Sequence, residues 1–507
     1  MQSSSPRIFN VLIGLALAAM LCTAHAQTLR IGLADDPDIL DPTLGRTFVG
    51  RFVFAALCDK LFDIDEHLAI VPQLATRYEW TADNKALTIR IREGVTFHDG
   101  EKLDAAAVKF SLERHKTLPG SNRTSELAPV ASIDVVDRYT VRLNLSAPFS
   151  PLLSVLADSA GIIVSPKAAR GAGEKFGAKP VCSGPFRFVE RVAQDRIVLE
   201  RYPGYWNKED IHFQRIVYMP IPDSTVLLAN LRSGQLDLIQ GLAPSDVPHL
   251  KSDARFKITK FPGLGYSGIT INVGKSDQAK KNPLGRDPRV REAFELSLDR
   301  QAIVQVAVDG EALVGNQWVA PTNPYYATNV PVPKRDLARA RALLKEAGVP
   351  NPSFTLMTPT APVAQQVAQV VQAMAREAGF DIKIQATEFA TSLDMADKGQ
   401  YDAHVVGWSG RIDPDGNTFR LMACNQPLNS AGYCNKEADD ILSKTRITRD
   451  TEERIGLYRQ LAPVVLKDRP IIYLYHANVL WAYKSTLQGL RALPDGLVRL
   501  QGVRLNP

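Results

Sequence analysis

The residues best suited to chemistry stand together in one segment, YDAHVVGWSGRIDPDGN, residues 401–417. An apolar run ends at Gly407, and the turn after it contains a tryptophan, an arginine and two aspartates, which are Trp408, Arg411, Asp413 and Asp415. A guanidinium offers a planar fork of donors that suits a carboxylate or phosphate, and an indole ring suits stacking on an apolar group. No catalytic partner stands nearby, so these residue types favour binding over catalysis.

Each of these side chains also has a structural role open to it. Arg411 could be a solvated loop cation, or it could pair with Asp413 or Asp415. Trp408 could serve packing, although its place beside a glycine at a strand end suits contact with an apolar part of a ligand. Asp415 is expected to shape the turn rather than to bind.

Motifs for catalysis, nucleotides and metals fit the sequence poorly. GLGYSG, residues 263–268, matches the dinucleotide pattern G-x-G-x-x-G, but a strand-like segment follows where a helix is required. DPDGN, residues 413–417, resembles the start of a calcium loop, but Cys424 stands where the loop needs a glutamate. The histidines are dispersed, and His404 and His476 are expected to be hydrogen-bonded core residues. We therefore expect no catalytic residue, no metal site and no cofactor. A catalytic triad assembled from residues far apart in the sequence would show no local motif, so it stays an alternative.

Alternating strands and helices place the Trp408 segment in the fold. From residue 354 the sequence predicts a strand, a helix closed by Gly379, a strand (DIKIQATEF), a short helix (TSLDMADKG) and a strand that ends near Gly407. This alternation predicts a parallel sheet, and ligands of such sheets lie beyond the carboxyl ends of the strands. The turn that contains Trp408 and Arg411 follows directly after such an end.

The first half of the chain has a different pattern. Short alternating segments such as ALTIRI (residues 86–91) and TVRLNL (residues 140–145) predict antiparallel strands. A helix that Asp104 can cap is expected between them, and another from a capping Ser224 to Gly234. The fold class is therefore α/β with mixed sheets. About 480 exported residues exceed what one hydrophobic core usually serves, so at least two domains are expected.

The first 26 residues have the features of a secretory signal peptide: Arg7, the apolar run VLIGLALAAM and the small-residue site AHA. The apolar run is shorter than the roughly 20 residues that a membrane-spanning helix needs. We expect cleavage after residue 26 and an exported protein. The formal net charge of +6 is scattered over the chain, which argues against a nucleic-acid partner.

Four of the five cysteines remain after the signal peptide, and an oxidising compartment favours two disulfides. Sequence alone allows three pairings. The short polar segment between Cys424 and Cys434 favours that pair, which leaves Cys58 for Cys182 by elimination. Free thiols are the alternative, and a metal site is disfavoured because no Cys-x-x-Cys is present.

The chain resembles the family 5 extracytoplasmic solute-binding proteins of ABC importers, which include dipeptide-, oligopeptide- and nickel-binding members. The resemblance rests on segments that follow in order through the exported chain: LCDKLFDID, a long segment that ends in FHDGEKLDAAAVKFSLER, CSGPFRFVE, RYPGYW, GITINVGK and YDAHVVGWSGRIDPDGN.

The resemblance implies a monomeric, two-lobed periplasmic-binding-protein fold that closes over a solute in the periplasm and delivers it to an inner-membrane ABC permease. It implies no enzyme activity. The expected division assigns 27–62, 180–262 and 478–507 to the core of lobe I, 63–179 to an extra β-rich subdomain inserted in that lobe, and 263–477 to lobe II.

The resemblance also bears on the site. In peptide-binding relatives a carboxylate soon after the Gly-Trp pair holds the peptide's ammonium group, and here Arg411 stands at that place while Asp413 follows two residues later. Dipeptide binders also carry an arginine just before the helix that matches residues 363–379, and this chain has none there. We therefore expect a peptide or peptide-like solute with a carboxylate, bound by Trp408, Arg411 and Asp413. A secreted hydrolase and a binder of a metal chelate are the alternatives.

Overall fold

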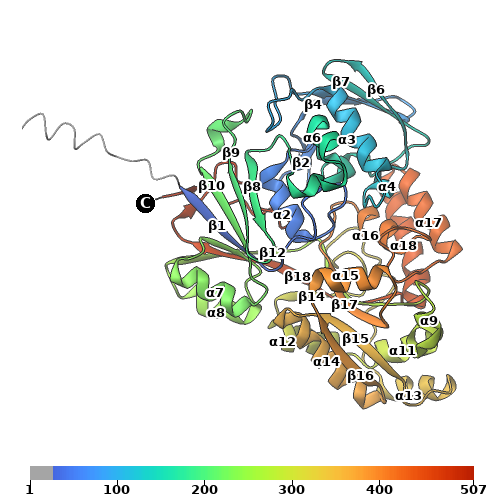
Figure 1. Ribbon diagram of the computed structural model, residues 1–507. Helices are drawn as coiled ribbons and strands as arrows, with labels where there is room; N and C mark the ends of the chain where they lie inside the picture. Colours follow the sequence, from blue (N-terminus) through green and yellow to red (C-terminus); the bar gives the residue numbers. More distant parts are fainter. Residues whose placement is uncertain (1–26, 507) are drawn as a thin grey trace, which may run out of the picture.

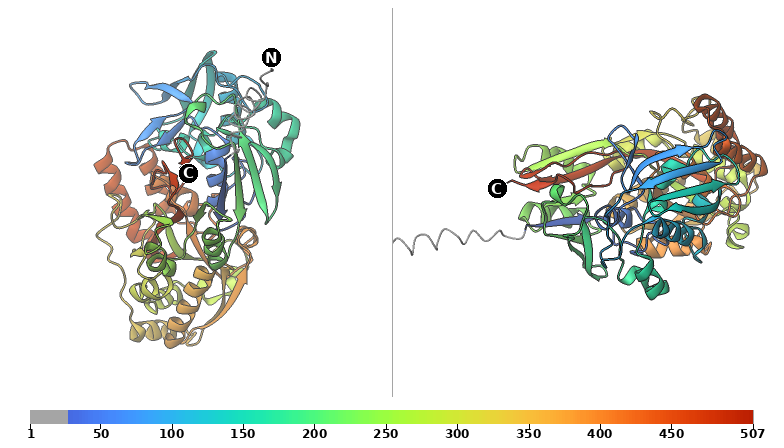
Figure 2. Two further views of the ribbon diagram at one scale, coloured as in Figure 1. Left: turned by 90° about the vertical axis from the view of Figure 1, so that its left-hand side faces the viewer. Right: turned by 90° about the horizontal axis from the view of Figure 1, so that it is seen from above.

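The computed structural model describes residues 27–506, so the expected signal peptide lies outside the described residues. The names lobe I, insert and lobe II are used below for the three expected parts of the chain. The insert lies at one end of the molecule, and the helices of lobe II from α11 (Pro288–Leu296) to α14 (Pro362–Ala378) lie at the other end (Figures 1 and 2). The C-terminal end returns to lobe I beside strand β1 (Thr28–Leu33). No helix within residues 27–506 is long and apolar enough to span a membrane.

One long strand, β18 (Ile471–Lys484), links the two lobes. Its first half, between Ile471 and Tyr475, pairs with β13 (Tyr266–Ile271) of lobe II. Its second half, from Asn478 to Lys484, pairs with β12 (Phe256–Pro262) of lobe I. The chain crosses between the lobes a second time in the short segment that joins β12 to β13. The two lobes therefore have separate hydrophobic cores but are joined by a continuous sheet, and a binding site can form between them.

Lobe I contains a mixed sheet in which β1 lies parallel to β10 and β11, while β9 and β8 continue it in antiparallel fashion. The helix expected from Ser224 begins one residue earlier than predicted, because Asp223 caps it and accepts from Thr225 and Val226 N–H. The elements are β1 (Thr28–Leu33), α2 (Phe48–Leu57), β8 (Phe186–Val192), β9 (Arg196–Arg201), β10 (Arg215–Pro220), α7 (Ser224–Ser233), β11 (Leu238–Gln240), α8 (Val247–Lys251), β12 (Phe256–Pro262), β19 (Leu487–Gln488) and β20 (Arg504–Leu505).

The insert is built on a four-stranded antiparallel sheet with the order β4-β5-β7-β6. Asp104 caps α3 by accepting from Ala107 N–H, as the sequence predicts. The elements are β2 (Phe62–Ile64), β3 (Ile70–Pro72), β4 (Ala75–Trp80), β5 (Ala86–Ile91), α3 (Ala105–Thr117), α4 (Thr124–Leu127), β6 (Val130–Asp137), β7 (Thr140–Leu145), α5 (Leu152–Leu156) and α6 (Pro166–Ala172). The insert has its own apolar core, although the region around α6 packs on the core of lobe I.

Lobe II confirms the predicted parallel arrangement, since β15 lies parallel to both β16 and β17. The elements before β17 are β13 (Tyr266–Ile271), α9 (Gln278–Lys281), α10 (Pro283–Arg286), α11 (Pro288–Leu296), α12 (Arg300–Val308), β14 (Ala312–Val314), α13 (Leu337–Glu346), β15 (Ser353–Pro359), α14 (Pro362–Ala378), β16 (Asp381–Thr387) and α15 (Phe389–Asp397). They are followed by β17 (Ala403–Trp408), α16 (Asp415–Met422), α17 (Lys436–Ile447) and α18 (Thr451–Asp468).

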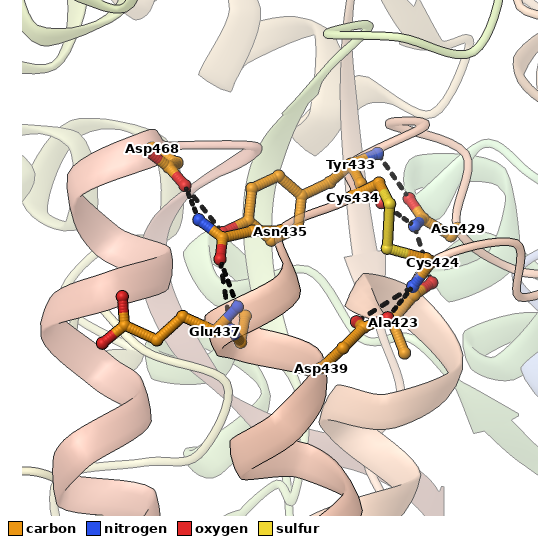
Figure 3. Close-up of a disulfide and its surroundings, with 10 residues drawn as sticks. Ala423, Cys424, Asn429, Tyr433, Cys434, Asn435, Glu437, Asp439 and Asp468 are labelled. Atoms are coloured by element: carbon orange, nitrogen blue, oxygen red, sulfur yellow. Dashed lines mark hydrogen bonds between the residues drawn. A yellow bond between two sulfur atoms is a disulfide. The ribbon is translucent and has the colours of Figure 1, made fainter.

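Two disulfides join the pairs that the sequence favours. Cys58, directly after α2, is bonded to Cys182 before β8, and Cys424 after α16 is bonded to Cys434 before α17. Figure 3 shows the second disulfide with Asn429 inside the loop that it closes. The amide of Asn429 donates to the carbonyls of Ala423 and Tyr433, so the disulfide and one buried side chain together hold this loop.

Candidate interlobe binding site

A cavity of about 140 Å³ lies between the lobes. Lobe I contributes only the residues at the start of α2. Lobe II contributes residues of β13, α15, β17, α16 and β18 and of the loop closed by Cys424 and Cys434. The lining residues are Arg46, Thr47 and Phe48 from lobe I, with Tyr266, Thr270, Phe389, Leu393, Ala396, Asp397, His404, Val406, Gly407, Trp408, Ser409, Leu421, Leu428, Ser430, Ala431 and Ile471 from lobe II. Most of these side chains are apolar or aromatic, as in sites that bind small molecules.

Trp408 reaches the cavity because it is the last residue of β17, where Tyr266 of β13 pairs with it. The chain then turns at Gly410, whose φ of 79° is the left-handed conformation that glycine adopts without strain. A Cβ at this position would come within 2.2 Å of the Leu264 carbonyl carbon. The turn therefore needs glycine both for its conformation and for its close approach to the strand connection.

Asn417 fixes the turn, and sequence reasoning missed it. Its buried side-chain oxygen accepts from the indole Nε1 of Trp408 at 2.9 Å and from the backbone N–H of Arg411 at 2.8 Å. The guanidinium of Arg411 lies 4.6 Å from the centre of the Trp408 ring. The indole is therefore held in one orientation with its polar edge already satisfied, which leaves ring surface for an apolar contact.

Arg411 does not line this cavity. It is buried and forms an ion pair with Asp158 of the insert, which also pairs with Arg51 of α2 at 3.0 Å. Burial lowers the pKa of Arg411 to about 9, so the guanidinium remains charged at neutral pH. Burial alone would raise the pKa of Asp158, but Arg411 and Arg51 outweigh it and hold that pKa well below its usual range. The pair is therefore fully ionic.

The two aspartates of the turn are also engaged in ion pairs. Asp413 accepts two hydrogen bonds from Arg454 of α18, at 2.6 and 2.7 Å, and Asp415 pairs with Arg446 of α17 at 3.2 Å. Arg411 and Asp413 line a separate cavity of about 20 Å³ beside Asp158. The structure thus places Trp408 on the interlobe cavity and places Arg411 and Asp413 outside it. Contact of these two residues with a solute stays a prediction.

Two residues that sequence reasoning did not single out give the interlobe cavity its charge. Of the described residues that line it, only Arg46 and Asp397 carry a full charge, and they form an ion pair from opposite lobes. Arg46 directly precedes Thr47, which caps α2, and Asp397 is the last residue of α15. Nothing in the sequence indicates this pair, because 351 positions separate its members.

His404 differs from the expectation of a fully hydrogen-bonded core residue. The side chain is buried on the cavity wall, and its Nε2 has no hydrogen-bond partner within residues 27–506. Burial lowers the pKa of His404 to about 3, so the ring is neutral at physiological pH and can donate or accept one hydrogen bond. His476 fits the expectation in part. Its Nδ1 donates to the Gly265 carbonyl at 2.8 Å, whereas its Nε2, like that of His404, has no hydrogen-bond partner within the described residues.

The part of the chain that the structure describes contains no cluster of three or more His, Cys, Asp or Glu side chains able to hold a metal ion. The cavity wall offers instead one arginine, one aspartate, one neutral histidine and a set of apolar rings. Such a surface can hold a small organic molecule with a few polar groups.

Comparison with known proteins agrees with this geometry. Residues 69–429 match the family described as bacterial extracellular solute-binding proteins, family 5 Middle. The glutathione-binding protein GsiB of Escherichia coli strain K12 is 28% identical over 500 residues, which cover 96% of each chain.

Two solved structures superpose on nearly the whole chain. The ABC transporter-associated periplasmic binding protein DppA from Helicobacter pylori, in complex with the peptide STSA, has a TM-score of 0.87 and 25% identity, and the match covers 94% of this chain and 98% of that one. The binding protein AgaA from A. tumefaciens R10, in complex with agropinic acid, has a TM-score of 0.87 and 25% identity, with 95% and 99% covered. The protein belongs to the family 5 bacterial extracellular solute-binding proteins and has their two-lobed fold.

Proposed function

We propose that the protein captures a peptide or peptide-like solute with a carboxylate between its lobes, in the periplasm, and delivers it to an inner-membrane ABC permease. The observation that carries this proposal is the cavity, whose wall comes from both lobes and is mostly apolar. The relatives support the class of solute, because their names and complexes refer to glutathione, a peptide and agropinic acid, all of which carry carboxyl groups.

Capture works through an equilibrium between open and closed lobes. A solute that contacts both walls of the cavity binds the closed form better and shifts the equilibrium towards it. The closed form is also held by direct contacts between the insert and lobe II. Arg411 pairs with Asp158, Arg420 donates to Glu126 at 2.6 Å, and Arg446 donates to the Ser125 carbonyl at 2.9 Å.

The three residues predicted from the sequence have different parts in this proposal. Trp408 contacts an apolar group of the solute. Arg411 carries the closing contact to Asp158, and Asp413 fixes the turn through Arg454, so both act on the solute through the shape of the site. The solute leaves unchanged, because the chain binds it without a reaction.

The proposal is tested with the purified exported chain, from Gln27 to the C-terminus. Isothermal titration with a panel of dipeptides and tripeptides should show one site per chain, and small-angle X-ray scattering should show a smaller radius of gyration with the bound solute. Incubation of the same solutes at high protein concentration should leave them intact. Hydrolysis of the solutes, or binding with no dependence on Trp408, would contradict the proposal.

A further inference from the structure

The ion pair between Arg46 and Asp397 differs from the other contacts across the lobes in its exposure. The side chains of Arg46 and Asp397 are 18% and 36% exposed, whereas those of Arg411 and Asp158 are 8% and 12% exposed. A pair in contact with water is worth little and is easily replaced, whereas parting a buried pair leaves charges without compensation. A solute that enters the cavity can therefore separate Arg46 from Asp397 at low cost.

The size of the cavity indicates where the polar part of a solute must go. A volume of about 140 Å³ is close to that of an apolar cavity that holds one benzene-sized body, which is about 150 Å³. A single apolar side chain fits among Phe389, Leu393 and Ile471. The charged groups of a peptide main chain need further space, and the parting of Arg46 and Asp397 would provide it.

Charge compensation then selects the type of solute. An anionic solute would pair with Arg46 but would leave Asp397 without a partner and close to the negative charge of the solute. A cationic solute would pair with Asp397 and would leave Arg46 without a partner. Only a solute with both a positive and a negative group gives Arg46 and Asp397 each a new ion-pair partner when the two side chains separate. The N-terminal end of α2, next to Arg46, adds positive potential on the same side.

From these observations we infer that the cavity selects zwitterionic, apolar-bodied solutes of the dipeptide type, with the carboxylate on Arg46 and the ammonium group on Asp397. This inference rests on the proposed function and adds the charge pattern of the solute. The two side chains lie on opposite lobes, so a zwitterion between them also links the lobes.

The test uses L-leucyl-L-leucine with two capped forms, N-acetyl-L-leucyl-L-leucine, which lacks the ammonium group, and L-leucyl-L-leucine amide, which lacks the carboxylate. Affinities for the wild type, Arg46→Gln and Asp397→Asn are measured by isothermal titration. Asp394→Asn is the matched control, because Asp394 lies on the exposed side of the same helix and pairs with Lys398 instead of lining the cavity.

The wild type should bind the zwitterion at least about tenfold more tightly than either capped form. Asp397→Asn should weaken the zwitterion and the amide by about tenfold or more. The same variant should bind the N-acetyl form more tightly than the wild type does, because Arg46 no longer has to leave an aspartate unpaired. Arg46→Gln should weaken the zwitterion and the N-acetyl form and should bind the amide more tightly, because Asp397 is then free to pair with the ammonium group. Asp394→Asn should change none of the three affinities.

Two failures are distinct. If the wild type binds all three forms alike, or if the variants weaken all three equally, the inference is overturned and the proposed function stands. If the wild type binds none of the three, the proposed capture of peptides fails for dipeptides and the inference fails with it.

Discussion

Arg411 of lobe II and Asp158 of the insert form an ion pair between the two lobes, and their side chains are only 8% and 12% exposed. The arginine stands where peptide-binding relatives are expected to carry a carboxylate for the ammonium group of the solute. In this chain that position holds a contact between lobes, and the charges that face the cavity come instead from Arg46 and Asp397. In the proposed mechanism, closure therefore rests on the Arg411–Asp158 pair and recognition on the Arg46–Asp397 pair.

The Arg411 pair should determine how well the lobes close. Arg411→Met leaves Asp158 buried with Arg51 as its remaining partner, and loss of one member of a buried pair costs about 3–5 kcal/mol. We expect solute affinity to fall by about tenfold or more, with a smaller effect on the melting temperature of the unliganded protein.

A double-mutant cycle with Asp158→Asn, measured by isothermal titration, separates this coupling from simple loss of packing. The cycle should be strongly non-additive, because the two side chains contact each other. Effects that add, or an affinity that remains unchanged in Arg411→Met, would remove the pair from the closing mechanism.

Trp408 should supply apolar contact to the solute. Trp408→Ala removes a large ring from the cavity wall and also leaves Asn417 without the indole donor, so we expect a loss of about 2–4 kcal/mol in binding free energy. Trp408→Phe keeps a ring at the same place and serves as the control, with a loss below about 1.5 kcal/mol. Titration of both variants with one solute tests this, and equal losses would mean that the ring does not touch it.

Substitution of His404 should have different effects on solute affinity and on the free energy of unfolding. His404→Leu removes a buried nitrogen that has no hydrogen-bond partner in residues 27–506, so the free energy of unfolding should stay the same or increase. If the solute uses this nitrogen, its affinity should fall by about 1–3 kcal/mol. Denaturant unfolding and solute titration on the same variant give both values. A destabilised protein with unchanged affinity would show that His404 serves the fold alone.

Solute affinity should depend on pH through Asp35, which follows β1 in lobe I. In this structure, which the proposed mechanism takes as the closed form, burial raises the pKa of Asp35 to about 7. The negative charge of Glu388 in lobe II adds to that rise. Lobe opening exposes the group to water and returns its pKa towards the ordinary value of about 4. Between these two values the closed form holds a proton that the open form lacks, so closure is favoured at low pH and this advantage is lost as pH rises through about 7.

The expected result is a decline in affinity from about pH 5 to about pH 8, of at most tenfold per pH unit. Asp35→Asn should flatten the profile, because the amide does not titrate. Titrations at several pH values with one solute compare the two proteins. Identical profiles would exclude Asp35 as the source of the pH dependence.

The two disulfides should serve different purposes. The Cys58–Cys182 bond closes 124 residues and the Cys424–Cys434 bond only 10, so loop entropy assigns them about 5 and about 2.7 kcal/mol of stability. Paired Cys→Ser variants should show the larger loss of unfolding free energy for the first. The second variant should lose more solute affinity, because its loop provides Leu428, Ser430 and Ala431 to the cavity wall. An unchanged affinity would contradict this.

Local patterns predicted much of the fold from the sequence. The alternation after residue 354 indicated parallel strands, and Trp408 lies at the end of one of them beside the cavity. The Arg46–Asp397 pair could not be predicted, because its members belong to different lobes and meet only in the folded chain. The partner of Arg411 was missed for the same reason. The sequence suggests Asp413 or Asp415, which stand nearby in the chain, whereas in the folded chain Arg411 pairs with Asp158.

The most direct test of solute capture is native mass spectrometry of the exported chain after incubation with a defined mixture of dipeptides of known mass. The account predicts a complex of one protein with one zwitterionic dipeptide, which denaturation releases at its original mass and which Trp408→Ala fails to retain. A protein that retains none of the dipeptides, or that releases amino acids in their place, would contradict it.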